Sequence, residues 1–412
     1  MFKILFIPYL ACYDRSKGAG CKVENFYIKE LARREEFDFR VLTFEDFDDE
    51  YESVIQDMKE YGIKGDVVCR DRSTIAKIKR GVRNIPSKYS PFDKYANFTS
   101  IYYLDVIRRY IKKYKCEGFI PDCVILGWTQ IIVYISEIKR LLPDAVVIAI
   151  EEDVSFLGIQ RKLDNEKDRF KQIILKQQYD KLRKVELESL SLADYAYVNN
   201  PKDFQLLIEN GLDASKIDWL VPWYDKYNKS VIRNIDWDKP FIIYYGAMGR
   251  PENYLSVQWL IENIMPLINS KIRLVVIGSG SETIEKFASE RVDILGFVDN
   301  VSPFFSRTMC LVAPLVLGAG IKIKVLEAMS AGVPVLTNQI GIEGIEAKSG
   351  KDYFYCKDAV DYANVINLAY EKKIELESIS KNARLITESK YDYSKSGQMI
   401  ANKVIDLLMT RE

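Results

Sequence analysis

The sequence predicts an α/β protein with two doubly wound, Rossmann-like domains. Short apolar runs, typical of buried parallel strands, alternate with helical stretches in both halves of the chain. Glycine turns follow several of these runs directly, at residues 18–20, 246–249, 278–280 and 318–320. The length of 412 residues is what roughly two domains of ordinary size require.

The composition narrows the possible chemistry. The chain has 59 basic and 59 acidic residues, and because its net charge is zero we expect no nucleic-acid partner. Histidine is absent, which excludes Ser-His-Asp triads and His-based metal sites and leaves carboxylates and backbone dipoles for catalysis. The seven cysteines form no CxxC pair and are odd in number, as expected for reduced cytoplasmic thiols.

Neither a signal peptide nor a transmembrane helix is expected. The first ten residues carry one charge and lack a small-residue cleavage site, so they are expected to form a strand instead. No apolar run approaches ~18 residues, the length that a membrane-spanning helix needs. We therefore predict a cytoplasmic location.

The first half is expected to form the first of the two sheets. Its expected strands are residues 3–8, 39–43, 123–127 and 146–150. Its expected helical stretches are residues 23–34, 108–115 and 164–191. A polar loop at 12–21, which contains Gly18 and Gly20, joins the first strand to the first helix and so opens a βαβ unit.

Three carboxylates, Glu151, Glu152 and Asp153, follow the strand at 146–150. Ligands bind at the carboxyl ends of parallel strands, and a cluster of like charges is costly unless it is solvated or matched by a cation. This segment is therefore either a candidate site or a charged loop end.

Residues 70–88 are strongly basic. Only Asp71 opposes seven cations, which are Arg70, Arg72, Lys77, Lys79, Arg80, Arg83 and Lys88. The pattern indicates either a solvated helix face or a contact with an anionic acceptor or an anionic membrane surface.

The second half repeats the alternation after an irregular linker at 223–240. A strand at 241–245 leads into the glycine turn 246–250 and a helix at 254–264. A strand follows at 274–277, directly before Gly278. Asp236 and Asp238 form an Asp-x-Asp pair in the linker, but they precede a strand instead of following one, so a metal role is not expected.

Residues 309–346 contain the most informative pattern. A strand at 310–314, a glycine turn at 318–320, a helix at 322–331 and a strand at 333–337 form a βαβ unit. The amides at the start of this helix favour an anion such as phosphate.

Lys322 and Lys324 lie at the predicted start of that helix. Cations there oppose the helix dipole, which indicates either a bound anion or two solvated lysines. Because residues two apart on a helix point in different directions, we expect one lysine, Lys324, to contact the anion.

The run G-x-G-I-K-x-K-V-L-E-A-M-x-A-G-V-P-V from residue 318, followed by G-I-E-G at 341–344, resembles the donor-site signature of GT-B retaining glycosyltransferases of the GT4 type, glycosyl transferases group 1. The resemblance implies two Rossmann-like domains that face a cleft. It implies an acceptor-side domain at 1–225, a nucleotide-sugar-binding domain at 226–390, and a C-terminal helix at 391–412 that crosses back to the N-terminal domain.

The resemblance also implies residue roles. Glu327 matches the glutamate that binds the ribose hydroxyls of the donor, whereas Ala319 replaces a second glutamate of the family. Asp153 matches the family's aspartate, and Glu152 stands where relatives have histidine. Catalytic roles fall on Asp153, Lys324 and Arg250. The implied donor site comprises Gly18, Gly20, Gly246, Gly278, Phe297, Val298, Gly318, Ala319, Gly320, Ile321, Lys322, Lys324, Leu326 and Glu327.

The implied reaction is retaining transfer of a sugar, a hexose above all, from a nucleotide-diphospho-sugar to a carbohydrate or lipid-linked hydroxyl acceptor. No metal or other cofactor is expected. The implied setting is cell-surface polysaccharide or glycoconjugate assembly, with residues 70–88 as a peripheral contact to the inner face of the membrane.

Two other functions stay open. A GT-B nucleotide-sugar 2-epimerase or an inverting transferase would use Asp153 or Glu152 as an acid or base. A catalytically inert GT-B subunit that binds a nucleotide sugar or a partner is favoured by Ala319 and disfavoured by Lys324 and Glu327.

Overall fold

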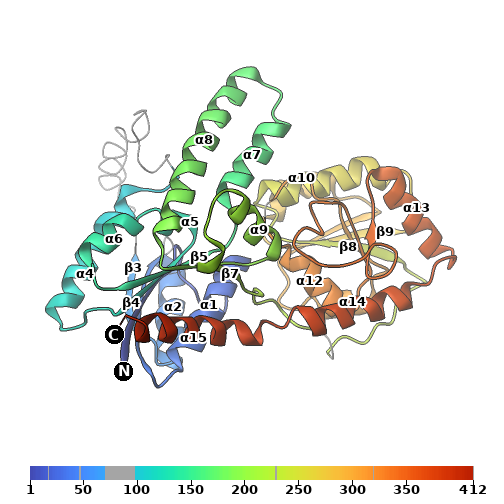
Figure 1. The fold of residues 1–412 in the computed structure, drawn as a ribbon. Helices are drawn as coiled ribbons and strands as arrows, with labels where there is room; N and C mark the ends of the chain where they lie inside the picture. The colour runs from blue at the N-terminus through green and yellow to red at the C-terminus, as the bar shows by residue number, and fades with distance from the viewer. Residues whose placement is uncertain (17, 46–47, 70–97, 228–229, 319, 412) are drawn as a thin grey trace. The chain divides into compact units, whose positions relative to one another are not determined.

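The computed structural model describes residues 1–411 except residues 17, 46–47, 70–97, 228–229 and 319. The basic segment 70–88 and Ala319 therefore lie outside the described residues. The chain folds into two compact units (Figure 1). Unit 1 contains residues 1–223 and 393–412, and unit 2 contains residues 224–392.

Unit 1 is built on a seven-stranded parallel sheet with the order β3-β2-β1-β4-β5-β6-β7. The order of the strands reverses between β1 and β4, and such a switch point is where ligands bind in doubly wound sheets. The strands are β1 (Phe2–Ile7), β2 (Phe37–Glu45), β3 (Lys64–Cys69), β4 (Cys123–Gly127), β5 (Val146–Glu151), β6 (Tyr195–Val198) and β7 (Ile217–Trp219).

Both faces of this sheet are covered, which explains the continuous apolar runs of its strands. In β1, Leu5 and Ile7 pack into one core and Ile4 and Phe6 into the other. Among its described residues, the helices of unit 1 are α1 (Ala19–Ala32), α2 (Asp48–Glu60), α4 (Ile101–Cys116), α5 (Thr129–Ile132), α6 (Ile135–Leu141), α7 (Ser155–Asn165), α8 (Arg169–Leu192), α9 (Pro201–Glu209) and α15 (Ser396–Met409).

The C-terminal helix α15 packs against α1 of unit 1, as the fold-class prediction requires. Its Ile400 and Val404 belong to the same core as Ile4 of β1. At its start, Ser396 Oγ donates a hydrogen bond of 2.8 Å to the carbonyl oxygen of Val221. The end of the chain thus completes the N-terminal unit.

Unit 2 contains a six-stranded parallel sheet with the order β10-β9-β8-β11-β12-β13 and a switch point between β8 and β11. The strands are β8 (Phe241–Tyr245), β9 (Arg273–Ile277), β10 (Val292–Gly296), β11 (Leu311–Ala313), β12 (Val335–Thr337) and β13 (Phe354–Tyr355). The helices are α10 (Pro251–Trp259), α11 (Ser302–Arg307), α12 (Ile323–Ser330), α13 (Ala359–Tyr370) and α14 (Leu376–Lys390), and a π turn, Leu260–Ile264, extends α10.

The predicted fold class, two doubly wound parallel sheets with a returning C-terminal helix, is confirmed. The first helix begins at Ala19 and not at residue 23, so that expectation is wrong. The helical region expected at 164–191 lies almost wholly in α8, and a preceding helix, α7, which was not expected, forms a hairpin with it. The chain turns there because Glu166 Oε1 accepts the amides of residues 167 and 168, and Asp168 then caps α8 through the amide of Lys171.

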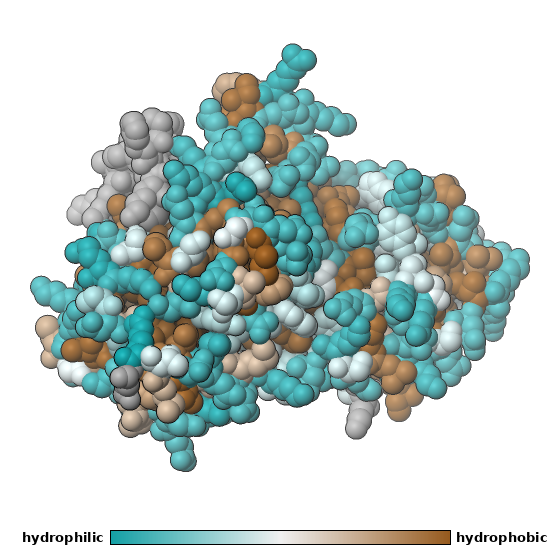
Figure 2. All heavy atoms as spheres, viewed as in Figure 1, coloured by the Kyte–Doolittle hydropathy of each residue, from teal (hydrophilic) through white to brown (hydrophobic). Residues whose placement is uncertain are grey.

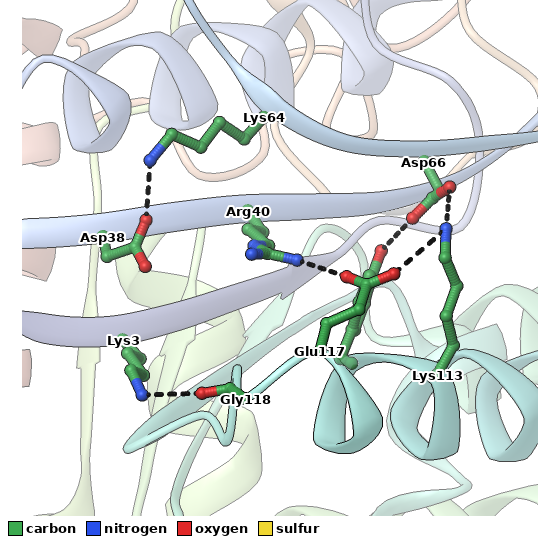
Figure 3. Close-up of polar contacts among 9 residues, drawn as sticks. Lys3, Asp38, Arg40, Lys64, Asp66, Lys113, Glu117 and Gly118 are labelled. Carbon is green, nitrogen blue, oxygen red and sulfur yellow. Dashed lines mark hydrogen bonds and ion pairs between the residues drawn. The ribbon is translucent and has the colours of Figure 1, made fainter.

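Ion pairs join β2, β3 and α4 (Figure 3). The pairs are Lys64–Asp38 at 3.0 Å, Arg40–Glu117 at 2.9 Å and Lys113–Asp66 at 2.7 Å. Pairs of this exposed kind typically contribute little to stability. The buried charges of unit 1 lie at the carboxyl edge of the sheet.

Candidate functional site

Two glycine turns approach each other at the carboxyl edge of the unit 2 sheet. Gly246 follows β8 and Gly278 follows β9, with φ of 153° and 150°. A Cβ on Gly278 would lie 1.7 Å from the carbonyl oxygen of Gly246, so no larger residue fits there. The Gly246 amide donates to the carbonyl oxygen of Ile277 at 3.0 Å. The two turns therefore form one tightly packed floor beside the switch point.

Lys324 reaches over this floor from the first turn of α12. Its Nζ donates to Asn253 Oδ1 at 2.5 Å and to the Tyr244 hydroxyl at 3.1 Å. The amine also lies 4.5 Å from the centre of the Tyr244 ring. A Cβ on Gly246 would come within 2.8 Å of Nζ, so the glycine makes room for the amine.

Burial lowers the pKa of Lys324 to about 7, against the opposing effect of the Glu252 carboxylate; the neighbouring cations Lys322 and Arg250 lower this pKa further. An anion bound beside the amine would raise its pKa and restore its charge. The position is therefore suited to an anionic ligand.

Lys322 is directed elsewhere. It is the N-cap of α12, so it precedes the helix and Lys324 lies within the first turn. Its Nζ donates to the carbonyl oxygen of Gly320 and lies 3.9 Å from Glu343 Oε2. The side chain is only 10% exposed. Lys322 thus links Gly320 to Glu343 in the loop that follows β12.

Glu327 lies one turn after Lys324 on α12. Its Oε2 accepts a hydrogen bond of 2.6 Å from the Tyr245 hydroxyl, and its Oε1 accepts one of 3.3 Å from the Asp225 amide. Burial and the Glu327 carboxylate raise the pKa of Tyr245, which keeps that hydroxyl protonated as a donor. The carboxylate is therefore held in a fixed orientation at the end of β8.

The other predicted donor residues differ in what they can offer. Arg250 is 61% exposed and pairs with Glu252 at 2.5 Å. Phe297, directly after β10, is 62% exposed. Leu326 is fully buried. Val298 and Ile321 lie in the loops after β10 and before α12.

Sequence reasoning did not single out Tyr244, Tyr245, Asn253 or Glu252. Tyr244 and Tyr245 end a strand directly before a glycine turn, a position that places polar atoms at a ligand-binding edge. That placement was the available signal for the tyrosines. Asn253 carried no such signal, because its contact with Lys324 joins residues 71 positions apart.

In unit 1, Gly18 and Gly20 lie at the start of α1. Gly18 is the N-cap, and a Cβ on Gly20 would lie 2.4 Å from the Trp128 ring. Trp128 follows β4 and has a φ of 65°, which is uncommon for a residue with a side chain. This close approach of α1 to the end of β4 requires glycine at position 20.

A group of buried carboxylates surrounds the same edge. Glu24 of α1 lies over Gly127. A Cβ added to Gly127 would come within 1.6 Å of Glu24 Oε1. Asn199 Nδ2 donates to Glu152 Oε2 at 2.6 Å. Burial raises the pKa of both glutamates, and the neighbouring charges of Glu152 on Glu24 and of Asp153 on Glu152 raise them further. Burial therefore favours the protonated form of both carboxyls.

Glu151 and Glu186 form a second carboxylate pair around Thr129. The Thr129 amide donates to Glu151 Oε1 at 3.1 Å. Glu186 accepts the first amides of α7, from Ser155 at 2.7 Å and Phe156 at 2.9 Å. Burial raises the pKa of Glu186 to about 8 although these amides oppose the shift. Asp153, next to Glu152, is half-buried.

Outside the gaps in the described chain, no three Cys, Asp or Glu side chains are grouped so that they could hold a metal ion. Among the described helices, none combines the length and the apolar character that crossing a membrane requires. In the linker, Asp236 pairs with Arg307.

Comparison with known proteins gives a family match in unit 2. Residues 239–372 match the family model described as glycosyl transferases group 1. An "uncharacterized 44.6 kDa protein in cps region" of Klebsiella pneumoniae is 24% identical over 185 residues, which cover 41% of this chain and 46% of that protein. An uncharacterized glycosyltransferase of Methanocaldococcus jannaschii is 26% identical over 217 residues, 50% of this chain and 54% of the relative. The chain spans about half the length of the curated relatives it matches.

Solved structures resemble the whole chain. Sucrose-phosphate synthase from Thermosynechococcus elongatus gives a TM-score of 0.70 at 14% identity and covers 100% of both chains. Anabaena HepE in complex with UDP-glucose gives 0.64 at 13% identity, over 98% of this chain and 100% of that one. WaaG, a glycosyltransferase involved in lipopolysaccharide biosynthesis, gives 0.64 at 14% identity, over 97% and 99%. These likenesses show the GT-B fold.

Proposed function

We propose that this GT-B chain, whose residues 239–372 form a glycosyl transferases group 1 domain, transfers a sugar from a nucleotide-diphospho-sugar to a hydroxyl acceptor with retention. The observation that supports this most is the position of Lys324. Its amine lies over the glycine turn after β8, in the first turn of α12, where helix amides without partners within the helix also point.

The same arrangement suggests how the donor would react. A diphosphate at this helix start would be held by amides and by Lys324, whose low pKa the anion would raise. Cleavage of the sugar–phosphate bond adds charge to the leaving oxygen, and a cation fixed there stabilises the transition state more than the ground state. Glu327, oriented by Tyr245, would accept the ribose hydroxyls.

We further propose that no metal is needed, because Lys324 and the helix amides would meet the diphosphate charge. Asp153 would orient the acceptor hydroxyl, and the leaving phosphate would take its proton. Arg250 would add a second cation near the diphosphate. The donor sugar would be a hexose, and UDP-glucose is the first to test because Anabaena HepE binds it. The acceptor would be a carbohydrate or a lipid-linked sugar of a cell-surface polysaccharide or glycoconjugate.

The direct test is turnover of a panel of nucleotide sugars by the full chain, with NMR assignment of the anomer formed. We expect release of nucleoside diphosphate in the presence of EDTA and a product with the donor's anomeric configuration. The control is Lys271→Ala, which removes an exposed lysine of unit 2 and should leave turnover unchanged. No turnover with any donor, or turnover that depends on Mn²⁺ or Mg²⁺, would contradict the proposal.

A second candidate, supported by the raised pKa of Glu152, is an acid–base reaction by an inverting transferase or a nucleotide-sugar 2-epimerase. The anomeric configuration of the product distinguishes an inverting transferase from a retaining one. An epimerised nucleotide sugar, formed without an acceptor and lost in Glu152→Gln, would identify the epimerase.

A further inference from the structure

The α7–α8 hairpin projects from the rest of unit 1 (Figure 1). Its inner end is anchored, because Leu182 and Leu190 of α8 are buried in the core and Glu186 caps α7. Its outer end is different, since most side chains of residues 162–180 are exposed. The exposed apolar side chains at the tip therefore do not anchor the hairpin to the core.

Three large apolar side chains lie on one side of that tip. Phe170, Ile173 and Ile174 are 72%, 58% and 41% exposed, and the spacing of three and four places them on one face of α8. Single exposed apolar residues are ordinary, but a group of them on a projecting element indicates a binding surface. No other helix of the described residues exposes three large apolar side chains on one face.

Cations surround this apolar face. Residues 161–184 contain four acidic residues and nine basic ones, namely Arg161, Lys162, Lys167, Arg169, Lys171, Lys176, Lys181, Arg183 and Lys184. At 100° per residue, Arg169 and Lys176 flank the apolar face on one side and Lys171 on the other. Lys176 pairs with Asp180 at 2.7 Å, but both side chains are more than half exposed, so the pairing is weak.

We infer that the tip of the α7–α8 hairpin docks on an anionic phospholipid bilayer. Figure 2 shows hydrophobic surface on this projection among hydrophilic side chains. An apolar helix face with flanking lysines and arginines is what binding in the plane of a bilayer interface requires. Phe170, Ile173 and Ile174 enter the interface, and Arg169 and Lys171 contact the anionic headgroups. The inference does not depend on the proposed reaction, because docking is measured without turnover.

The test is sedimentation of the full chain with vesicles of phosphatidylcholine alone or mixed with phosphatidylglycerol. We expect binding to the mixed vesicles, weakened by salt because surface charge is screened over ~8–10 Å. The triple variant F170S/I173S/I174S should lose at least about tenfold in the partition coefficient, as expected when most of the inserted apolar area is removed. A matched triple variant of exposed apolar residues in unit 2, I232S/V360S/L385S, should bind like the original chain.

A second variant separates charge from apolar insertion. R169E/K171E should abolish the preference for phosphatidylglycerol, with circular dichroism and melting unchanged in every variant. Equal binding to neutral and anionic vesicles, no binding, or binding that survives F170S/I173S/I174S would overturn the inference. So would a dimer, seen by sedimentation velocity and lost in that variant, because the apolar face would then bind a second copy of the chain.

Discussion

The carboxyl edges of the two sheets have the same topology and opposite chemistry. Each lies at a switch point, at β1 and β4 in unit 1 and at β8 and β11 in unit 2. At the carboxyl edge of unit 2, the ionisable group set over the glycine floor is a partly buried amine, Lys324. The buried groups of unit 1 are carboxyls, among them Glu24 and Glu186. The fold places a site at both edges, and the side chains determine which ligand each accepts.

Burial lowers the pKa of the lysine and raises the pKa of the carboxyls, so it favours the uncharged form of both kinds of group. Lys324 has a pKa lowered to about 7, and Glu186 has one raised to about 8. A bound anion would raise the pKa of the lysine toward its ordinary value and so favour the charged amine. Protonated carboxyls instead place neutral hydrogen-bonding groups at the other edge. Four predictions test this contrast.

The largest effect is expected for Lys324→Ala. If its amine stabilises the leaving diphosphate, kcat should fall by about 10²–10³-fold with a smaller rise in KM for the donor, the scale for removing one preorganised donor. Lys322→Ala should do less, because that amine is bonded to Gly320 and lies near Glu343. Steady-state kinetics with intact melting behaviour provides the measurement. A larger loss in Lys322→Ala would move the diphosphate to the other lysine.

The next effect concerns the glycine floor. Gly278→Ala should destabilise unit 2 by about 3 kcal/mol, because its Cβ meets a backbone oxygen and its φ is one that only glycine adopts easily. Gly249→Ala is the matched control, since a Cβ there meets nothing within 4 Å. Urea denaturation of the two variants should differ clearly. Similar midpoints would show that the two turns can separate without cost.

The sequence predicts some features of the fold accurately and others poorly. The strands at 123–127 and 241–245 were predicted at their observed bounds, because continuous apolar runs before glycine turns are a local signal. The early start of α1 was missed, since glycines disfavour helices and Gly20 is helical only where it packs against Trp128, far along the chain. Tertiary contacts of that kind leave no local pattern.

In the candidate site, too, the residues of a local motif were predicted and their partners from other elements were not. Lys324 and Glu327 follow from a compact motif, whereas their partners Asn253 and Tyr245 come from other elements. Glu24 was not predicted because one acidic residue on an amphipathic helix usually faces solvent, and only the packing over Gly127 shows that it is buried. The hairpin turn at 166–168 was missed because side-chain caps at Glu166 and Asp168 make it, without glycine or proline.

A smaller effect is expected for Glu327→Ala. Loss of hydrogen bonds between a carboxylate and ribose hydroxyls should weaken donor binding by about 1–3 kcal/mol. The fold should persist, because the Tyr245 hydroxyl also lies 2.8 Å from the carbonyl oxygen of Lys324, which can accept its proton. Titration calorimetry with the donor and with the nucleoside diphosphate provides the measurement. Unchanged affinity in a folded variant would remove Glu327 from the donor site.

The last prediction distinguishes the two edges by the sign of their pH dependence. Glu186 has a folded pKa of about 8 against an ordinary 4.5, so between these values the folded chain binds more protons than the unfolded one. The free energy of unfolding must then fall as pH rises through this window. Lys324 has a folded pKa of about 7 against an ordinary 10.5, so the unfolded chain binds more protons between them and stability rises with pH.

One group contributes at most about 1.4 kcal/mol per pH unit. Glu186→Gln should therefore flatten the fall below pH ~8, and Lys324→Met should flatten the rise above pH ~7. Urea denaturation from pH 5 to 10 provides the measurement. If both variants changed the slope in the same direction, the two edges would not hold opposite buried charges, and the contrast between them would fail.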